Sequence, residues 1–224
     1  MVARGFYERG AKVLLGERLR GARPDYGWLS EESEDDGSRL SAPRTWVVDP
    51  IDGTRAFVAK RPEFSIAAGL VQDGRPVMGV VVNPATDEVF AACEGGRLRR
   101  NGKLTKPLPE CRLTAARVLG SRHMIEAAIG ATDGSEYFKV NSIAYRMAMV
   151  AAGSYDAAVA LSPTSNWDIA AAHALVLAAG GCVSGRGGEP IVYNRPSTRH
   201  HGVIAAGPKL HAEITERFRG GPLG

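Results

Sequence analysis

Two aspartates three residues apart lie in the hexapeptide Asp49-Pro50-Ile51-Asp52-Gly53-Thr54. Pro50 removes a backbone donor and Gly53 permits unusual dihedral angles, so both carboxylates can face one point. The carbonyl of Ile51 adds another hard oxygen, and the amides of Gly53 and Thr54 can face an anion if a helix begins there. A donor set made only of oxygen favours magnesium over zinc.

Each of these features has a simpler explanation when it stands alone. Asp-Pro and Asp-Gly pairs commonly mark turns, and Asp168, at the expected start of a helix, could be an ordinary N-cap. A metal site is favoured by three features in order: an acidic loop at 30–33 that contains Glu31, the 49–54 turn, and Asp168 opening an Ala-rich helix that ends in Gly-Gly.

The elements expected to position these residues are a mixture of strands and helices. A β-rich run at 45–48 stops at Asp49-Pro50 and should deliver Asp49 to a loop. Two more β-rich runs flank Asp73-Gly74, a dipeptide typical of hairpins. The predicted strands are 45–48, 64–71, 76–82, 87–93 and 156–161, and the predicted helices are 7–20, 143–152 and 167–179.

This order of elements predicts layered sheets and helices, an α/β protein of the α+β type, rather than a bundle or an all-β sandwich. The length of 224 residues allows one domain or two lobes that share a cleft. We expect an N-terminal α+β lobe at 1–130 that carries the Glu31 and 49–54 motifs. A C-terminal α/β lobe at 131–224 would then carry Asp168.

Composition excludes several other classes of protein. The chain is 44% hydrophobic and 23% charged, as globular proteins are, and its net charge of +4 suits an anionic substrate. The basic run at 97–106 is typical of a solvated loop, so nucleic-acid binding is not expected. Three distant cysteines without CxxC spacing predict reduced thiols and no structural zinc. No apolar run reaches the ~20 residues of a membrane span and the start lacks a signal-peptide core, which predicts a cytoplasmic protein with no membrane partner.

Three segments together resemble the signature segments of the inositol monophosphatase family in order and spacing: WLSEES, WVVDPIDGTRAF and NWDIAAAHALVLAAGG. The resemblance covers about residues 8 to 217. It implies a layered α-β-α-β-α fold and a lithium-sensitive, magnesium-dependent phosphomonoesterase with two or three ions. A small phosphorylated molecule would be the substrate, and the chain could form a homodimer.

The same resemblance assigns roles to residues of this chain. The metal ligands would be Glu31, Asp49, the carbonyl of Ile51, Asp52 and Asp168. Glu31 and Thr54 would orient the attacking water, Asp49 would bridge two ions, and Asp52 with Asp168 would hold the ion at the leaving group. Substrate contacts are expected from Asp52, Gly53, Thr54, Ser142, Arg146 and Asp168.

Substrate choice stays open, because the family includes inositol monophosphatases, 3'(2'),5'-bisphosphate nucleotidases and histidinol phosphatases. Leu161 stands where inositol-specific members carry an acidic residue. Arg146 stands where nucleotidase-like members carry a lysine that can approach a second phosphate. Asn141 replaces the usual glycine before Ser142. These residues predict that the substrate is a bisphosphate nucleotide or an inositol monophosphate, with histidinol phosphate as an alternative. A different class of function is also considered, a catalytically weak family member that binds anions or partners.

The first residues depart from the family, whose members usually carry a helical hairpin and a Thr-x-x-Asp motif before the acidic loop. In register, Gly5 takes the place of the Thr and Glu8 that of the Asp. We therefore expect an N-terminally shortened fold of marginal stability and weak activity, in which Glu8 is a poor partner for Thr54.

Overall fold

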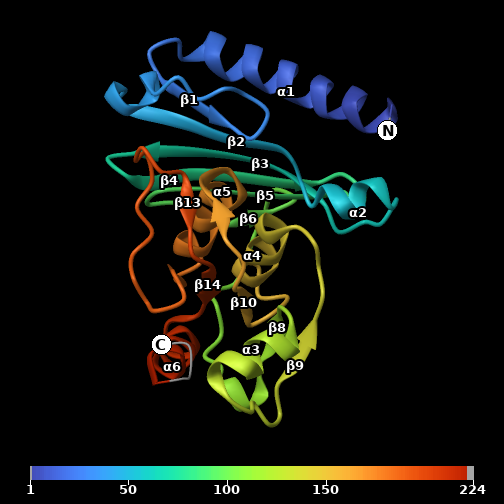
Figure 1. Cartoon of the computed structure of the whole chain (residues 1–224), viewed down its shortest axis with the longest axis vertical. Coiled ribbons are helices and arrows are strands. Elements are labelled where there is room, and N and C mark those ends of the chain that lie inside the picture. The colour runs from blue at the N-terminus through green and yellow to red at the C-terminus, as the bar shows by residue number, and fades with distance from the viewer. Residues whose placement is uncertain (1, 221–224) are drawn as a thin grey trace.

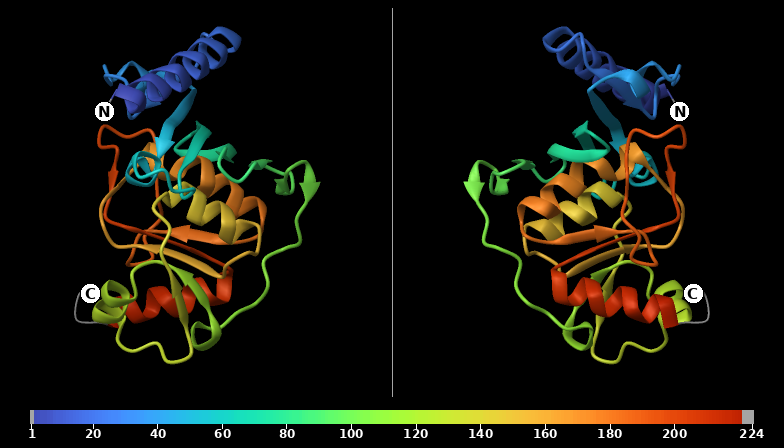
Figure 2. Two further views of the ribbon diagram at one scale, coloured as in Figure 1. Left: turned by 90° about the vertical axis from the view of Figure 1, so that its right-hand side faces the viewer. Right: turned by 90° about the vertical axis from the view of Figure 1, so that its left-hand side faces the viewer.

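The chain folds into layers of helix and sheet, stacked in the order helix, sheet, helix, sheet, helix (Figure 1). The structure is a computed structural model that describes residues 2–220. Helix α1, Val2–Ala22, lies against β2 on the outside of the first sheet, and α4 with α5 lies between the sheets. Helices α3 and α6 cover the far side of the second sheet (Figure 2). The predicted layered fold is confirmed.

The first sheet is a meander whose seven strands lie in sequence order. Only β1 and β2 are parallel; every later pair is antiparallel. The β3–β4 hairpin turns at Asp73 and Gly74, whose φ angles of 51° and 74° confirm the predicted turn. The strands are β1 Gly27–Ser30, β2 Arg44–Asp52, β3 Ser65–Gln72, β4 Arg75–Asn83, β5 Glu88–Cys93, β6 Arg99–Arg100 and β7 Lys103–Leu104.

Strand β2 corrects one prediction, because it does not stop before Asp49. It continues to Asp52 through a register irregularity between Asp49 and Asp52. Pro50 is tolerated inside the strand because such a bulge interrupts the ladder of hydrogen bonds. Asp49 therefore projects from a strand and not from a loop.

The second sheet has the strand order β12-β14-β10-β8-β9. Of these strands, the sequence indicated only β10. They are β8 Arg117–Leu119, β9 Glu136–Phe138, β10 Ala157–Ala160, β12 Cys182–Ser184 and β14 Val203–Ala206. A separate two-stranded ladder joins β11 Thr164–Ser165 to β13 Arg199–His200.

The helices that the sequence indicated are all present, and others accompany them. Gly153 and Gly180 have positive φ just after α4 and α5, as expected of C-terminal caps. Glu8 lies in α1, but its side chain is outside the described residues. The remaining helices are α2 Thr54–Val58, α3 Arg122–Ile129, α4 Ile143–Ala151, α5 Asn166–Ala178 and α6 Pro208–Gly220, with short 3-10 turns η1 Ser38–Ser41 and η2 Leu113–Ala115.

Helix α5 is the central element, because it is buried on nearly all sides between the two sheets (Figure 2). Its alanines let the helix backbone approach β3 and β4 closely. A Cβ added at Gly69 would lie 2.9 Å from the nitrogen of Ala171, and one at Gly79 would collide with the Ala171 carbonyl. Glycine is thus required on both strands by the approach of the helix.

One apolar cluster joins the first sheet, α4, α5 and part of the second sheet, and another lies beneath α3 and α6. The first sheet ends at Leu104 and the second begins at Arg117, while the lobe boundary expected at residue 130 stays a prediction. Across residues 2–220, no helix is long and apolar enough to cross a membrane.

Candidate metal centre

Three aspartates from two elements converge on one point. Asp49 and Asp52 come from the end of β2, and Asp168 comes from the first turn of α5. One carboxylate oxygen of each lies within 4.8 Å of the others. Asp49 is 1% exposed and Asp52 is 9% exposed, so the three charges are held largely away from bulk water.

Hydrogen bonds within the hexapeptide orient the carboxylate of Asp49 and shape the turn that follows it. The amide of Ile51 donates to Oδ1 of Asp49 at 2.9 Å, and the hydroxyl of Thr54 donates to the carbonyl of Ile51 at 3.2 Å. Gly53 has φ of 87°, and an added Cβ there would lie 2.8 Å from the carbonyl of Glu63. Only glycine fits this turn, which leads from β2 directly into α2.

Asp52 is fixed by the start of α4. Its Oδ2 accepts hydrogen bonds from the hydroxyl of Ser142 at 2.6 Å and from the amide of Ala144 at 2.7 Å. The Ser142 hydroxyl also accepts from the amide of Tyr145 as the N-cap of the helix. Because Ser142 is completely buried, the structure places it behind Asp52, where it orients that carboxylate.

Asp168 has two structural tasks. Ser165 is the N-cap of α5, and Asp168 completes the capping box by accepting from the amide of Ser165 at 2.6 Å. The capping explanation offered by the sequence is therefore partly right, although Asp168 is the third residue of the helix and not its cap. The same carboxylate faces Asp49 and Asp52.

Burial and mutual repulsion oppose ionisation of the cluster. Burial is the main cause that raises the pKa of Asp49 well above its usual value, followed by the charges of Asp52, Glu31 and Asp168. Burial likewise raises the pKa of Asp52 to about 6, although its bonds to Ser142 and Ala144 and the charge of Arg146 oppose the rise. The pKa of Asp168 is raised to about 7 by burial and then by Asp52.

A divalent cation bound between these carboxylates would offset their mutual repulsion and favour their ionised forms. The donors are carboxylate and carbonyl oxygens, the ligands that magnesium prefers, and the cluster among the described residues lacks the His and Cys ligands typical of zinc. The three aspartates, together with Glu31 and Ile51, therefore fit a magnesium site.

A cavity of about 310 Å³ brings Glu31, Ile51, Gly53 and Thr54 of the expected site together with the aspartates, whereas Ser142 and Arg146 do not line it. Glu31, just beyond β1, is exposed and lines the same cavity as Asp49, and its charge contributes to the raised pKa of Asp49. The lining residues are Glu31, Asp49, Ile51, Asp52, Gly53, Thr54, Arg55, Asn141 and Asp168.

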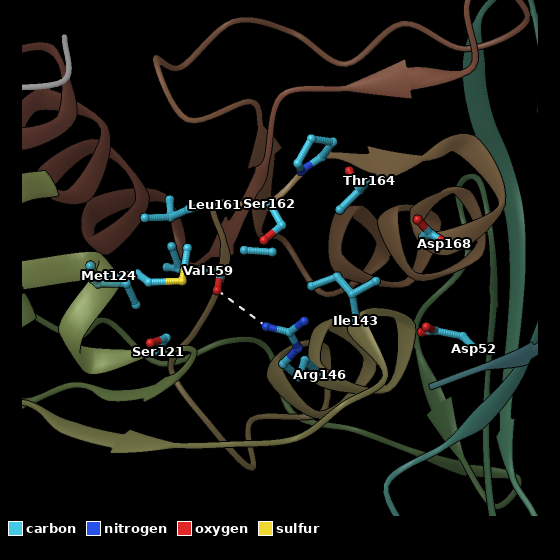
Figure 3. Close-up of a pocket in the computed structure, with 13 residues that line it drawn as sticks. Asp52, Ser121, Met124, Ile143, Arg146, Val159, Leu161, Ser162, Thr164 and Asp168 are labelled. Atoms are coloured by element: carbon cyan, nitrogen blue, oxygen red, sulfur yellow. Dashed lines mark hydrogen bonds between the residues drawn. The ribbon is translucent and has the colours of Figure 1, made fainter. Parts of the chain in front are cut away.

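A second cavity, of about 260 Å³, adjoins the first and shares Asp52 and Asp168 with it. Figure 3 shows these two aspartates at one end, Met124 and Leu161 at the other, and Arg146 between them. Among residues 2–220, Arg146 makes two long hydrogen bonds, at 3.4 Å each, to the carbonyls of Val159 and Ser142. Burial lowers its pKa and the charge of Asp52 opposes that shift.

Several residues of this second cavity carried no sequence signal. Ser121 and Met124 come from the start of α3, while Ser162 comes from the loop after β10 and Thr164 from β11. They lie outside any motif, and only the folding of the second sheet brings them to the aspartates. The proximity of Ser162 and Thr164 to Asp168 along the chain was the one available clue.

Comparisons with known proteins agree with this geometry. The sequence profile described as the Inositol monophosphatase family matches residues 8–221. Inositol monophosphatase 2 of Solanum lycopersicum is 33% identical over 190 residues, 79% of this chain and 72% of that protein. The 3'(2'),5'-bisphosphate nucleotidase CysQ of Escherichia coli K12 is 30% identical over 192 residues, 82% of this chain and 76% of that protein.

Solved structures share the fold. The extragenic suppressor protein suhB from Bartonella henselae superposes with a TM-score of 0.83 at 28% identity, over 96% of this chain and 89% of that one. Inositol monophosphatase II from Staphylococcus aureus superposes with a TM-score of 0.85 at 23% identity, over 96% and 82%. With its acidic cluster at the end of β2 and the start of α5, the chain therefore belongs to the inositol monophosphatase family and is a phosphatase of that family.

Proposed function

We propose that this phosphatase uses magnesium to hydrolyse a small phosphate monoester and that its preferred substrate is a 3'(2'),5'-bisphosphate nucleotide. An inositol monophosphate is the second candidate. The observation that supports the first choice is the position of Arg146, whose guanidinium lies in the cavity that adjoins the aspartates.

Magnesium, when bound, would neutralise the anionic phosphate and lower the pKa of a water molecule so that it can attack in line. Asp49, Asp52, Asp168, Glu31 and the carbonyl of Ile51 would hold it. Thr54, which lines the same cavity as Glu31, would help to orient the water through its hydroxyl. Ser142 would keep Asp52 aimed at the centre through its 2.6 Å hydrogen bond.

Arg146 distinguishes between substrates because its donors are incompletely used. A guanidinium offers five N–H donors, and here it makes two long bonds to carbonyl oxygens. A phosphate group could replace these with charge-assisted bonds. The far end of the cavity is apolar at Met124 and Leu161, which suits the face of a nucleobase better than the hydroxyls of a cyclitol.

The second candidate has its own support. Relatives of similar identity carry both names, an inositol monophosphatase at 33% and a bisphosphate nucleotidase at 30%. The metal centre serves either substrate, so the cavity around Arg146 decides the preference.

A substrate panel tests the proposal: adenosine 3',5'-bisphosphate, inositol 1-phosphate, histidinol phosphate and p-nitrophenyl phosphate, each with magnesium and with EDTA. We expect magnesium-dependent release of phosphate from all good substrates and the highest kcat/KM on the bisphosphate. A preparation that binds magnesium yet releases no phosphate from any of them would support a catalytically weak, anion-binding member of the family.

The variant Arg146→Ala should lower kcat/KM on the bisphosphate by roughly 10- to 100-fold, the equivalent of one hydrogen bond to a charged group. Its effect on inositol 1-phosphate should be small. Arg122→Ala removes an arginine from an exposed ion pair with Glu126 on α3 and serves as the control. Equal losses on both substrates would contradict the assignment of Arg146.

A further inference from the structure

The segment 193–200 runs beside α5 (Figure 1). It makes hydrogen bonds at three places: the start of α5, His173 on the same helix, and Arg39. It begins in the loop after β12 and ends with β13. None of its residues lines either cavity. It nevertheless makes buried and partly buried hydrogen bonds to α5, which carries Asp168, and to η1, which follows the loop that contains Glu31.

The first attachment is at the start of α5. His200 Nε2 lies 2.7 Å from Oδ1 of Asn166, two residues before Asp168. Because an amide oxygen can only accept, His200 must carry its proton on Nε2 and donate it. The backbone N–H of Asn166 also donates to the carbonyl of Thr198 at 2.8 Å. The two residues before Asn166 form β11, which pairs with β13.

Asn166 is an unusual choice for this position if it serves packing alone. It is completely buried, and its side-chain nitrogen has no hydrogen-bond partner among the described residues. A buried amide donor without a partner lowers stability. The bond from His200 to Asn166 Oδ1 gives this residue a function that an apolar side chain could not supply.

The second attachment lies two helical turns further along α5. The hydroxyl of Tyr193, a buried residue, lies 2.9 Å from Nδ1 of His173. Residues 166 and 173 are seven apart, so they lie on the same face of the helix. The rings of Tyr193 and His200 also contact each other edge to face, with centroids 5.8 Å apart. The segment therefore lies along one face of α5 and is bonded to it at two points.

The third attachment reaches the loop that follows Glu31. Arg39 is 1% exposed, and it donates to Asn194 Oδ1 and to the carbonyl of Arg195, each at 3.0 Å. Asn194 donates back to the carbonyl of Arg39 at 3.1 Å. The same guanidinium donates to both carboxylate oxygens of Asp35, to Oδ1 at 3.0 Å and to Oδ2 at 2.7 Å.

We propose that residues 193–200 act as a brace that fixes the position of Asp168 relative to the Glu31 loop, with His200 and Arg39 as positioning residues for the metal ligands. The geometry supports this because Asp168 and Glu31 lie far apart in the chain, and the brace is bonded to α5, which carries Asp168, and to η1, which contacts β1 just before Glu31. The inference rests on the proposed magnesium-dependent function, but it concerns metal affinity and can be tested without turnover.

The test compares His200→Phe with His211→Phe in the full chain. His211 is a matched control, because its Nε2 lies 2.9 Å from the hydroxyl of buried Ser184, between α6 and β12, outside both cavities. Binding of Mn2+, which takes similar oxygen ligands, is measured directly by electron paramagnetic resonance. Melting temperature and the magnesium concentration for half-maximal phosphatase activity are measured beside it.

We expect His200→Phe to weaken Mn2+ binding measurably, by up to ~10-fold, since loss of a direct partner of a ligand costs about 10- to 100-fold and His200 acts one bond further away, through Asn166. His211→Phe should retain the wild-type affinity even if its melting temperature falls as far. His200→Gln keeps a side-chain N–H donor and should recover most of the affinity. Tyr193→Phe, which removes only the hydroxyl next to His173, provides a milder variant if His200→Phe does not fold, and it should weaken binding by a smaller factor.

Unchanged Mn2+ affinity in the folded His200 and Tyr193 variants, or equal weakening in His211→Phe, would overturn the brace. A wild-type chain that binds no Mn2+ would also overturn it. If the wild type binds Mn2+ and the variants behave as expected, yet no phosphate ester is hydrolysed, the proposed function fails and the brace stands.

Discussion

The negative charge of the metal centre is concentrated on Asp49, Asp52 and Asp168, and their surroundings make that charge unfavourable until a cation neutralises it. Burial is the largest cause of the raised pKa at each of the three. The three buried carboxylates thus favour the binding of a cation, but they lower the stability of the fold when no metal is bound. This opposition gives single substitutions effects of different sign on activity and on stability.

Asp49→Asn should reduce magnesium-dependent kcat/KM by at least ~100-fold, because loss of even a ligand's partner costs 10- to 100-fold. In EDTA the same variant should melt at a higher temperature than the wild type, since one of the repelling buried charges is gone. Phosphate release and thermal melts measure the two effects. Asp87→Asn is the control, an exposed residue in a turn with φ of 52° that asparagine accepts easily. Near-normal turnover in Asp49→Asn would show that Asp49 is not a metal ligand.

The raised pKa of Asp168, about 7 against an ordinary 3.8, predicts a pH dependence of stability. In EDTA the folded state holds this proton more tightly than the unfolded state, so the contribution of Asp168 to stability falls as pH rises from about 4 through about 7. Asp168→Asn abolishes that titration. Its stability relative to the wild type should therefore increase between pH 5 and pH 8, by on the order of 1 to 3 kcal/mol.

The buried histidines also make stability depend on pH, in the opposite direction to Asp168. Their contribution is the same in the variant and the wild type, so it cancels in the difference between the two proteins. Burial lowers the pKa of His173 to about 3, so that residue favours folding less as pH falls below its ordinary value of 6.5. Urea melts at each pH give the difference. A difference in unfolding free energy that stays constant with pH would show that Asp168 is ionised throughout. In saturating magnesium at pH 8, the wild type should instead be the more stable of the two proteins.

At the scale of elements, the centre depends on how closely α5 lies against the first sheet. Gly69 and Gly79 on β3 and β4 face Ala171 at a distance that excludes any side chain. Because α5 is rigid and begins at the metal centre, a displacement of the helix at Ala171 also moves Asp168. Packing of the helix and geometry of the centre are therefore linked.

Gly79→Ala should destabilise the fold by about 1 to 3 kcal/mol, the usual effect of overpacking, and should weaken Mn2+ binding as well. Gly21→Ala is the control, since no atom lies within 4 Å of the added methyl group and the residue is in helix α1; it should be neutral or slightly stabilising. Urea denaturation and Mn2+ titration of both variants provide the measurements. Wild-type stability in Gly79→Ala would mean that the helix and sheet can separate without loss.

At the scale of the whole molecule, the two sheets share one apolar core. The larger cluster contains Val47, Ala67 and Phe90 from the first sheet, and Ala158 and Ala205 from the second. The three converging aspartates are likewise divided between the first sheet and α5. We therefore expect both sheets to unfold together, and metal binding to stabilise both of them.

We expect a single unfolding transition that shifts to higher temperature with magnesium, by an amount that corresponds to about 2.7 kcal/mol at 100 times the dissociation constant. Tryptophan fluorescence and far-ultraviolet circular dichroism should give the same midpoint, since Trp46 lies on the first sheet and Trp167 on α5. Two separate transitions, or a melting temperature that is the same in EDTA and magnesium, would contradict this picture.

The sequence by itself identified the chemistry, because carboxylates at short spacing and strong helix formers act locally. The 49–54 hexapeptide, the helices at 143–152 and 167–179, and the Asp73-Gly74 hairpin are all recognisable within a few residues. Strand β14 was missed because all four of its residues are buried, so it shows no alternation of polar and apolar positions. Strand β2 was ended too early because Pro50 resembles a terminator unless a bulge accommodates it.

Tertiary structure alone decided which distant residues meet. Asp168 lies 116 positions after Asp52 in the chain, and only the packing of α5 against β3 and β4 places them within 4.8 Å. The position of Arg146 between the aspartates and Met124, and the bonds from Arg39 and His200 to segments far along the chain, have no local signature. Periodicity and motifs report the environment of neighbouring residues, whereas such contacts depend on how closely whole elements can approach one another.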